Sequence, residues 1–475
     1  MHKSKLITLL RGLTKAEMKE LESFLHAPMF VVTPEVLKLY KSLFRQYPKY
    51  DTERIEKDNL AGYLFPKDTE KNALKKLNYT MSSFTKIVEE YILWIETKQQ
   101  TNDRDFLLLK AYRRRNIDKL FFKTGHDFLK RLEKSPIRDA QYYHDQFQVN
   151  NIIYHHTNTV KGAPQESLKE TIKNLDLFYI SARLMQYLYI LTRKAQVVEN
   201  SNILLTEEIL ELVKSDPLKT NPLLNIYQLL IDYLQGNKVD EAHYFQTKEM
   251  FFEHFDIFSK LEKENIITFI INYANLLYKS GKEHFFEELF DLHNFTIERR
   301  ILFVDNFLLS TIYYNTVNIG CELGKLDWAE DFIEKNSIFL RKNVRHSMKQ
   351  LSLAHFHCCK KNYDQTLICL RSLEFKNHIY EITSKVLITR CYFEEKNEAL
   401  LSSFLHSFTA FVRRHKRMPN SQKEAVLNFI KFTSRISKNW YSHKYTKEQL
   451  LQQISQHPNL NNRRWLRQKV EELRS

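Results

Sequence analysis

Residues 324–333, GKLDWAEDFI, and residues 361–370, KNYDQTLICL, align with each other at a shift of 37 residues. On the segment before each of them, the same shift relates Val317, Ala354 and Cys391. Small side chains at equivalent positions allow neighbouring helices to approach closely, and self-similarity at a period of 20–50 residues is typical of repeat proteins. The sequence therefore predicts a unit of two helices that recurs along the middle of the chain.

The period extends towards the N-terminus with slightly longer spacings. Ala274 lies 43 residues before Val317, Leu230 lies 44 residues before Ala274, and Gly281 and Gly324 fall at the expected turns. On the second helix of each unit the aligned residues are Ala242, Ala329, Thr366 and Ser403. The pattern resembles the tetratricopeptide repeat, which implies an all-α superhelix of helical hairpins. The alternative is a set of irregular hairpins without a common superhelix.

Composition favours the same fold class. The 475 residues include only 8 Gly and 10 Pro, so the chain has few of the residues that make tight turns. This excludes a many-turned β-sandwich, and the absence of a Gly-rich loop excludes the phosphate sites of Rossmann and P-loop proteins. With 43% hydrophobic and 13% aromatic residues, the chain is also unlike a disordered protein.

Helix starts are marked by capping residues. A capping box places Ser or Thr before the helix and Glu or Gln three residues later, so that each side chain bonds to the backbone of the other. The pairs with this spacing are Thr14 with Glu17, Ser421 with Glu424, and Thr446 with Gln449. Thr33 before Pro34 predicts another start, because proline is favoured at the first helical position.

We expect four segments from these signals. Residues 1–100 form an N-terminal helical module, residues 101–220 form helical hairpins, residues 221–412 form the tetratricopeptide-like repeats, and residues 413–475 form a basic C-terminal helical cap. Short connections between the segments predict antiparallel neighbouring helices.

Both ends of the chain carry a further resemblance. The stretches that show it are FLHAPMF (24–30), YPKYD (47–51), LFP (64–66), MSSFTKIVEEYI (81–92), NFIKFTSRISK (428–438) and RRWLRQKVEEL (463–473). Together they resemble an uncharacterised bacterial family of large all-helical proteins. Ala27, Met29 and Val31 stand where that family has Ser, Tyr and Asn. The resemblance implies an all-helical fold and implies no activity or catalytic residue.

The sequence predicts a cytoplasmic protein. The apolar stretch 6–10 is too short for the core of a signal peptide. The uncharged run 306–321 has 16 residues with several polar ones, which is short of the roughly 20 apolar residues that a membrane span requires. The 5 Cys are odd in number and lie between positions 321 and 391 without a disulfide-framework spacing, so we expect reduced thiols.

The net charge of the chain is +15, and the charged residues are unevenly distributed along it. Residues 201–300 hold 10 basic and 17 acidic residues, whereas residues 401–475 hold 15 basic and 4 acidic residues. A basic surface of this kind can contact nucleic acid, an acidic membrane surface, an acidic partner or the acidic middle of the same chain. The candidate basic patch consists of Arg413, Arg414, Lys416 and Arg417.

The most metal-like string is HFHCC at residues 355–359. On a helix, His355 and His357 point to nearly opposite sides, and His355 with Cys358 or Cys359 gives only two ligands on one face. A structural zinc site needs four ligands, so we expect buried thiols of a repeat helix and no metal or cofactor. Because no nucleophile with its partners is evident either, we expect that the protein is not an enzyme.

The repeat register predicts a binding groove. In a tetratricopeptide-like array, the residues one after and two before each small position of the first helices face the concave side. These residues are Asn272, Asn275, Asn315, Asn318, Ser352, His355, Thr389 and Tyr392. Asn side chains both donate and accept hydrogen bonds, which suits the backbone of an extended peptide.

The leading hypothesis is therefore a non-enzymatic scaffold or adaptor that binds a protein or peptide. Two alternatives stay open. The Asn side chains can instead bond to neighbouring helices and maintain the superhelix, and the basic C-terminal region can instead bind RNA or single-stranded nucleic acid. The sequence gives no indication of the oligomeric state.

Overall fold

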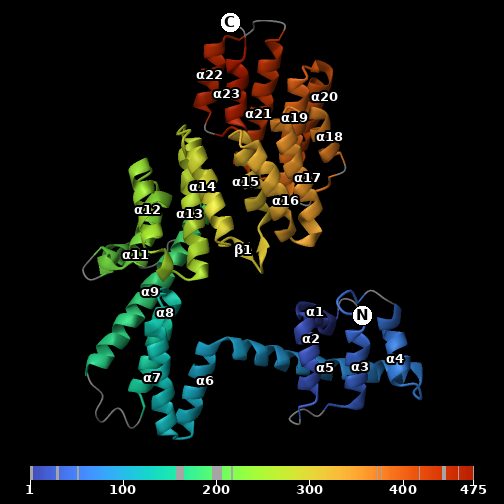
Figure 1. The fold of residues 1–475 in the computed structure, drawn as a ribbon, viewed down its shortest axis with the longest axis vertical. Helices are drawn as coiled ribbons and strands as arrows, with labels where there is room; N and C mark the ends of the chain where they lie inside the picture. The colour runs from blue at the N-terminus through green and yellow to red at the C-terminus, as the bar shows by residue number, and fades with distance from the viewer. Residues whose placement is uncertain are drawn as a thin grey trace. The chain divides into compact units, whose positions relative to one another are not determined.

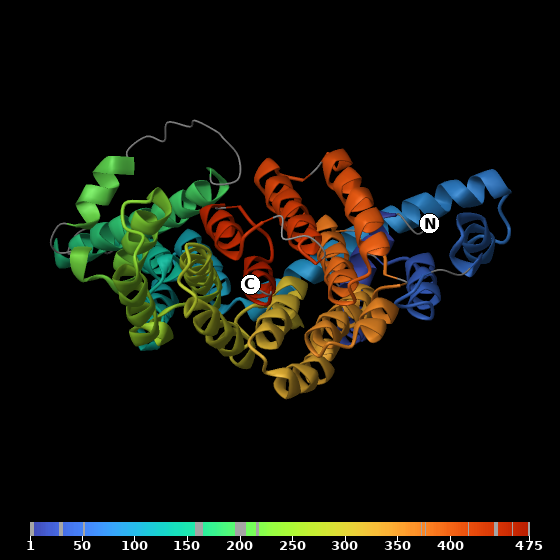
Figure 2. The same ribbon diagram turned by 90° about the horizontal axis from the view of Figure 1, so that it is seen from above.

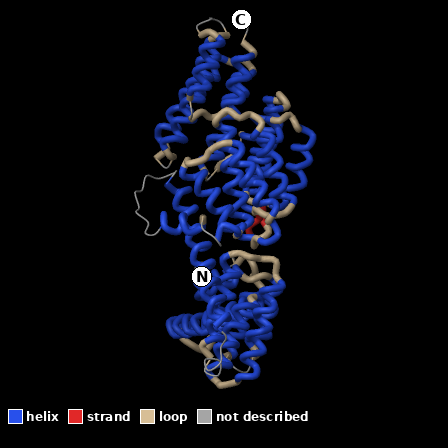
Figure 3. Tube along the Cα trace, turned by 90° about the vertical axis from the view of Figure 1, so that its left-hand side faces the viewer, coloured by secondary structure: helices blue, strands red, loops and turns tan. Residues whose placement is uncertain are grey.

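The computed structural model describes residues 4–27, 32–50, 53–156, 165–194, 206–214, 218–371, 373–375, 377–416, 418–440, 445–457 and 459–473. Within these ranges the protein is all-α, as the sequence predicts (Figure 3). The strands that they contain form one antiparallel hairpin, in which Phe303 of β1 (Phe303–Val304) pairs with Leu308 of β2 (Phe307–Leu308). No helix in these ranges is both long enough and apolar enough to span a bilayer.

The chain divides into two compact units, which are described separately. The first comprises residues 1–135 and 145–171, and the second comprises residues 136–144 and 172–475. Residues 221–412 and 413–475, which the sequence pattern assigns to two separate segments, thus lie in the same unit.

In the first unit, the helices α1 to α4 pack around α5 (Figure 1). The helices of this unit are α1 (Lys5–Gly12), α2 (Lys15–Leu25), α3 (Pro34–Phe44), the 3-10 turn η1 (Glu53–Ile55), α4 (Lys57–Leu64), α5 (Glu70–Gln99), α6 (Thr101–Arg114), α7 (Asp118–Lys134) and most of α8 (Ala140–Tyr154). Leu77, Phe84 and Tyr91 recur every seven residues on α5 and are fully buried against α1–α4. The helical period thus places one apolar face of α5 in the core.

The second unit contains the remaining helices. They are α9 (Gln165–Lys194), α10 (Thr206–Val213), η2 (Leu218–Thr220), α11 (Pro222–Gln235), α12 (Glu241–Glu253), η3 (Phe255–Ile257), α13 (Lys260–Lys279), α14 (Phe285–Glu298), α15 (Ser310–Glu322), α16 (Leu326–Asn336), η4 (Ser337–Phe339), α17 (Lys342–Cys359), α18 (Tyr363–Leu370), α19 (His378–Glu394), α20 (Glu398–Arg414), α21 (Asn420–Lys438), α22 (Lys447–Gln456) and α23 (Arg463–Glu471). The first part of α9 belongs to the other unit.

Successive helices from α11 to α21 pack on their neighbours, and α15, α17 and α19 also pack on one another in that order. The small residues of the first helices, Ala274, Val317, Ala354 and Cys391, are all fully buried. At Gly320 a Cβ atom would lie 2.6 Å from the Trp328 ring, so a glycine is what allows α15 and α16 to approach this closely.

On the second helices, only some of the aligned residues occupy the buried packing positions that the repeat pattern predicts. Ala329 and Thr366 are buried, whereas Ala242 and Ser403 are exposed and do not occupy a packing position. The physical reason is that α20 presents its larger apolar residues to the core, Leu401 among them, so the fixed shift of 37 residues does not hold there.

The C-terminal helices lie on the inner side of the curve that α13 to α20 follow (Figure 2). Two contacts hold α23 there through one residue of α19: Trp465 Nε1 donates to the Glu394 carboxylate at 2.9 Å, and Lys469 Nζ lies 2.9 Å from it. Arg467 pairs with Glu283, just before α14, at 3.1 Å. The basic C-terminal region and the acidic 201–300 region therefore meet directly at this ion pair.

Candidate functional site: a polar cavity lined by amides

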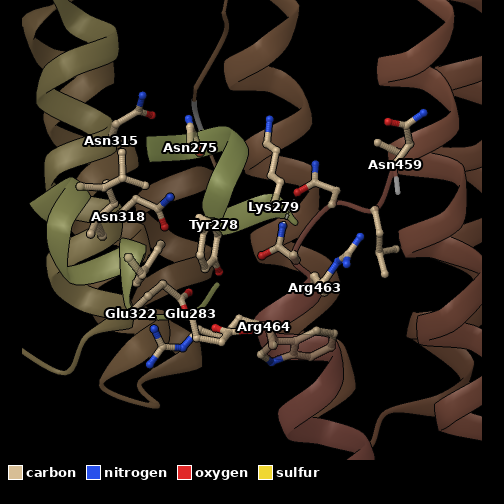
Figure 4. Close-up of a pocket in the computed structure, with 18 of the residues that line it drawn as sticks. Asn275, Tyr278, Lys279, Glu283, Asn315, Asn318, Glu322, Asn459, Arg463 and Arg464 are labelled. Carbon is tan, nitrogen blue, oxygen red and sulfur yellow. Dashed lines mark hydrogen bonds between the residues drawn. The ribbon is translucent and has the colours of Figure 1, made fainter. Parts of the chain in front are cut away.

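A cavity of about 570 Å3 lies in the second unit, between α13–α15 on one side and the C-terminal segment on the other (Figure 4). Its lining residues are Asn275, Tyr278, Lys279, Glu283, Phe286, Leu289, His293, Asn315, Asn318, Ile319, Glu322, Ser421, Gln422, Ala425, Asn459, Leu460, Asn461, Asn462, Arg463, Arg464 and Trp465.

The first wall follows from helical spacing. Asn315, Asn318 and Glu322 occupy positions i, i+3 and i+7 of α15, which places them on one face. Val317, on another face of α15, is fully buried. On α13, Asn275 follows the buried Ala274 and starts a polar face that runs towards the C-terminal end of the helix. Burial of the small packing residues thus directs the amides into the cavity, where Figure 4 shows them.

The second wall is held by hydrogen bonds between its own elements. Asn428 on α21 donates to the Asn459 carbonyl at 3.0 Å, and the Asn461 N–H donates to the Ala425 carbonyl at 3.2 Å. Asn462 has a left-handed backbone with φ of 52°, directly before α23. Asn is one of the few non-glycine residues that tolerate this conformation. The Asn-rich turn 459–462 is therefore fixed against α21.

Both carboxylates of the cavity are already bound by arginine. Glu283 pairs with Arg467, and Glu322 accepts from Arg390 at 2.5 Å. Lys279 and Arg464 form no ion pair with any residue that the structure describes, and Arg464 lies over the Phe286 ring at 5.1 Å. The cavity therefore presents neutral amides with a cationic margin.

Two further side chains reach the cavity in their neutral forms. Burial raises the pKa of Tyr278 to about 12 and lowers the pKa of His293 to about 4. His293 is 3% exposed, and its Nδ1 atom has no hydrogen-bond partner among the described residues. A buried ring nitrogen without a partner is uncommon, so this wall has an unused polar atom.

The predicted groove residues fall into three groups. Asn275, Asn315 and Asn318 line the cavity, and their side chains form no hydrogen bond with any described residue. Asn272 is exposed on α13 outside the cavity. Ser352 and Thr389 are fully buried.

His355 and Tyr392 do not line the cavity either. Tyr392 is half-buried and packs edge-on against Phe404 at 5.6 Å. His355 lies in a buried polar cluster: its Nδ1 is 2.9 Å from the Tyr314 hydroxyl, and its Nε2 is 3.2 Å from the Glu322 carboxylate. Although burial opposes it, the contact with Arg390 holds the pKa of Glu322 well below its usual range.

The basic patch lies elsewhere in the second unit. Arg413 and Arg414 form the last turn of α20 and Lys416 follows; all three are exposed, and none pairs with an acidic side chain within the described ranges. Arg417 lies outside the described residues.

Sequence reasoning missed the second wall of the cavity. Its signal is the run NLNNRR at residues 459–464, in which three amides directly precede the amphipathic helix α23 and the two arginines are its first residues. Such a run reads as an ordinary loop, and only the folded chain places it opposite Asn315 and Asn318.

Comparison of the chain with protein-family models, with curated proteins and with solved structures finds no match in any of the three. The resemblances noted in the sequence therefore stay predictions, and the function has to be argued from the cavity itself.

Proposed function

We propose that this protein is a non-enzymatic scaffold that binds an extended segment of a partner protein in the cavity between α13–α15 and the C-terminal helices. The observation that carries the proposal is the group Asn275, Asn315 and Asn318, whose amides face the cavity without a partner among the described residues. A peptide backbone alternates donors and acceptors, and each amide offers both. An extended peptide can therefore form hydrogen bonds with these amides in any alignment of its residues along the cavity.

The remaining features of the cavity support the same ligand class. Its volume of about 570 Å3 falls within the range of roughly 300–1,000 Å3 in which proteins enclose ligands. Glu283 and Glu322 are both bound by arginine, so neither carboxylate is a free general base. We place this surface in a tetratricopeptide-like superhelix in the cytoplasm, where free thiols like the five cysteines persist.

The test is a selection from a library of unstructured peptides, followed by affinity measurement. Asn275 and Asn318 are replaced together by Ala, and Asn272→Ala is the matched control because Asn272 is exposed on the same helix outside the cavity. Two hydrogen bonds of about 0.5–1.5 kcal/mol each predict a loss of affinity of about 5- to 150-fold. Unchanged affinity in the double variant, or selection of no peptide above background, would reject the proposal.

The second candidate function is binding of RNA or single-stranded nucleic acid by the basic patch. It is favoured by Arg413, Arg414 and Lys416, which are exposed and unpaired within the described ranges. Replacing these three residues by Glu should then weaken RNA binding and reduce its dependence on salt, because each lost phosphate contact lowers the salt slope. Equal RNA binding and equal salt slopes in both proteins would exclude the patch.

A further inference from the structure

Three potential metal ligands converge at one end of the cavity. The Glu322 carboxylate oxygen, the His355 ring nitrogen and the Cys359 thiol lie within 4.8 Å of one another. His355 and Cys359 are four residues apart on one face of α17, and Glu322 comes from the end of α15. The sequence motif at residues 355–359 supplied only His355 and Cys359, because Glu322 lies on the preceding helical hairpin.

The spacing within this cluster suits a tetrahedral ion. With ligand bonds of roughly 2.0–2.3 Å, the ligand atoms around zinc are about 3.3–3.8 Å apart. Glu322 Oε1 is 3.2 Å from His355 Nε2 and 3.8 Å from Cys359 Sγ. We propose that Glu322, His355 and Cys359 form a binding site for a divalent zinc-class ion, with water as the fourth ligand of the tetrahedron. This inference does not depend on the peptide ligand proposed above.

The surroundings of His355 support the assignment. The Tyr314 hydroxyl lies 2.9 Å from Nδ1. With a metal on Nε2, the proton resides on Nδ1 and is donated to the Tyr314 oxygen, which is the outer contact that metal-binding histidines use to fix their orientation. Without metal, the contacts of His355 with Tyr314 and Glu322 remain as hydrogen bonds, so the same residues are satisfied in both states.

Ligand chemistry and charge also support the assignment. On metal binding the Cys359 thiol loses a proton to solvent, and the Glu322 carboxylate and the Cys359 thiolate together match the two charges of the ion. A thiolate and an imidazole favour zinc over magnesium or calcium.

The ion can reach the cluster from the cavity. The Glu322 side chain is 18% exposed and lines the cavity, whereas His355 is 4% exposed. Arg390 holds the Glu322 carboxylate in place at 2.5 Å. The site thus has a ligand at the cavity surface and a shielded interior.

The test uses the whole protein, freed of metal by a chelator and titrated with Co2+ as a spectroscopic probe and with Zn2+ in competition. We expect one ion per chain and a near-ultraviolet thiolate-to-cobalt charge-transfer band. Cys359→Ser should abolish the band and weaken binding at least tenfold, while Cys369→Ser, the matched control outside the cluster, should behave like the parent protein.

The outcomes separate the metal site from a purely structural polar cluster. Absence of Co2+ and Zn2+ binding, or binding without a thiolate band, would overturn the proposal, as would an unchanged band in Cys359→Ser. His355→Gln should also lose the band. Circular dichroism of each metal-free variant checks folding, and Cys359→Ser decides the question if His355→Gln does not fold, because it removes only a thiol contact at 3.8 Å.

Discussion

Replacing Glu262 by Gln removes an ionisable group from the core of the second unit. Glu262 on α13 is 7% exposed, and the hydroxyl of Tyr227 on α11 donates to its carboxylate. Burial is the main reason that the pKa of Glu262 is raised to about 7; the bond from Tyr227 opposes the rise, and the charge of Asp139 adds to it. Gln has nearly the same shape and still accepts from Tyr227, so the substitution isolates the effect of the charge.

The sign and size of the effect follow from the two pKa values. The folded-state pKa of about 7 lies above the ordinary value of 4.5, so the folded protein binds the proton more tightly than the unfolded chain. The stability due to this group is present below pH 4.5 and is lost as the pH rises to 7. A difference of about 2.5 pKa units corresponds to about 3 kcal/mol, so Glu262→Gln should be more stable than the parent protein by up to that amount at pH 8.

The measurement is urea denaturation of the parent protein, Glu262→Gln and Glu253→Gln at pH 4, 6 and 8. Glu253 is the matched control because it is exposed at the end of α12 and forms no ion pair with a described residue. The advantage of Glu262→Gln should grow between pH 4 and 8, and Glu253→Gln should show no such trend. A difference between the parent protein and Glu262→Gln that is equal at pH 4 and pH 8 would refute the reasoning.

Three further substitutions test the packing of the two units, each followed by urea denaturation. Gly320→Ala should cost about 1–3 kcal/mol, because its new Cβ would lie 2.6 Å from the Trp328 ring; a neutral result would show that α16 moves freely. Gly62→Ala has open space within 4 Å and should instead gain about 0.5–1 kcal/mol from helix propensity; a loss would contradict this. Arg390→Met should cost about 3–5 kcal/mol because it leaves the Glu322 charge without its partner; a stable variant would mean that Glu322 takes up a proton instead.

Local signals in the sequence were sufficient for the fold class and for several helix starts. Thr14 with Glu17 and Thr446 with Gln449 form the predicted capping boxes. The third predicted box, at Ser421, is wrong: α21 begins at Asn420 after Pro419, so Ser421 is already inside the helix. Pro419 and Ser421 are both residue types that can precede a helix, so the local sequence does not decide between them, and packing in the folded chain does.

Local signals in the sequence predict only some of the residues of the candidate site. Helical spacing identified Asn275 and Asn318, because both lie beside small residues that must be buried. It also placed His355 in the groove, whereas the structure buries it against Tyr314. The Asn-rich turn 459–462 and the third potential metal ligand could not be predicted, because each depends on contact between distant parts of the chain.

The ribosome synthesises the two walls of the cavity at different times. The last residue of the first wall, Glu322, leaves the ribosome about 140 residues before Trp465 in the second wall, which at 5–20 residues per second is roughly 7–30 s. During that interval the amides and the apolar lining formed by Phe286, Leu289 and Ile319 face solvent. The nascent chain thus exposes apolar surface of the kind that chaperones bind until the second wall has been made.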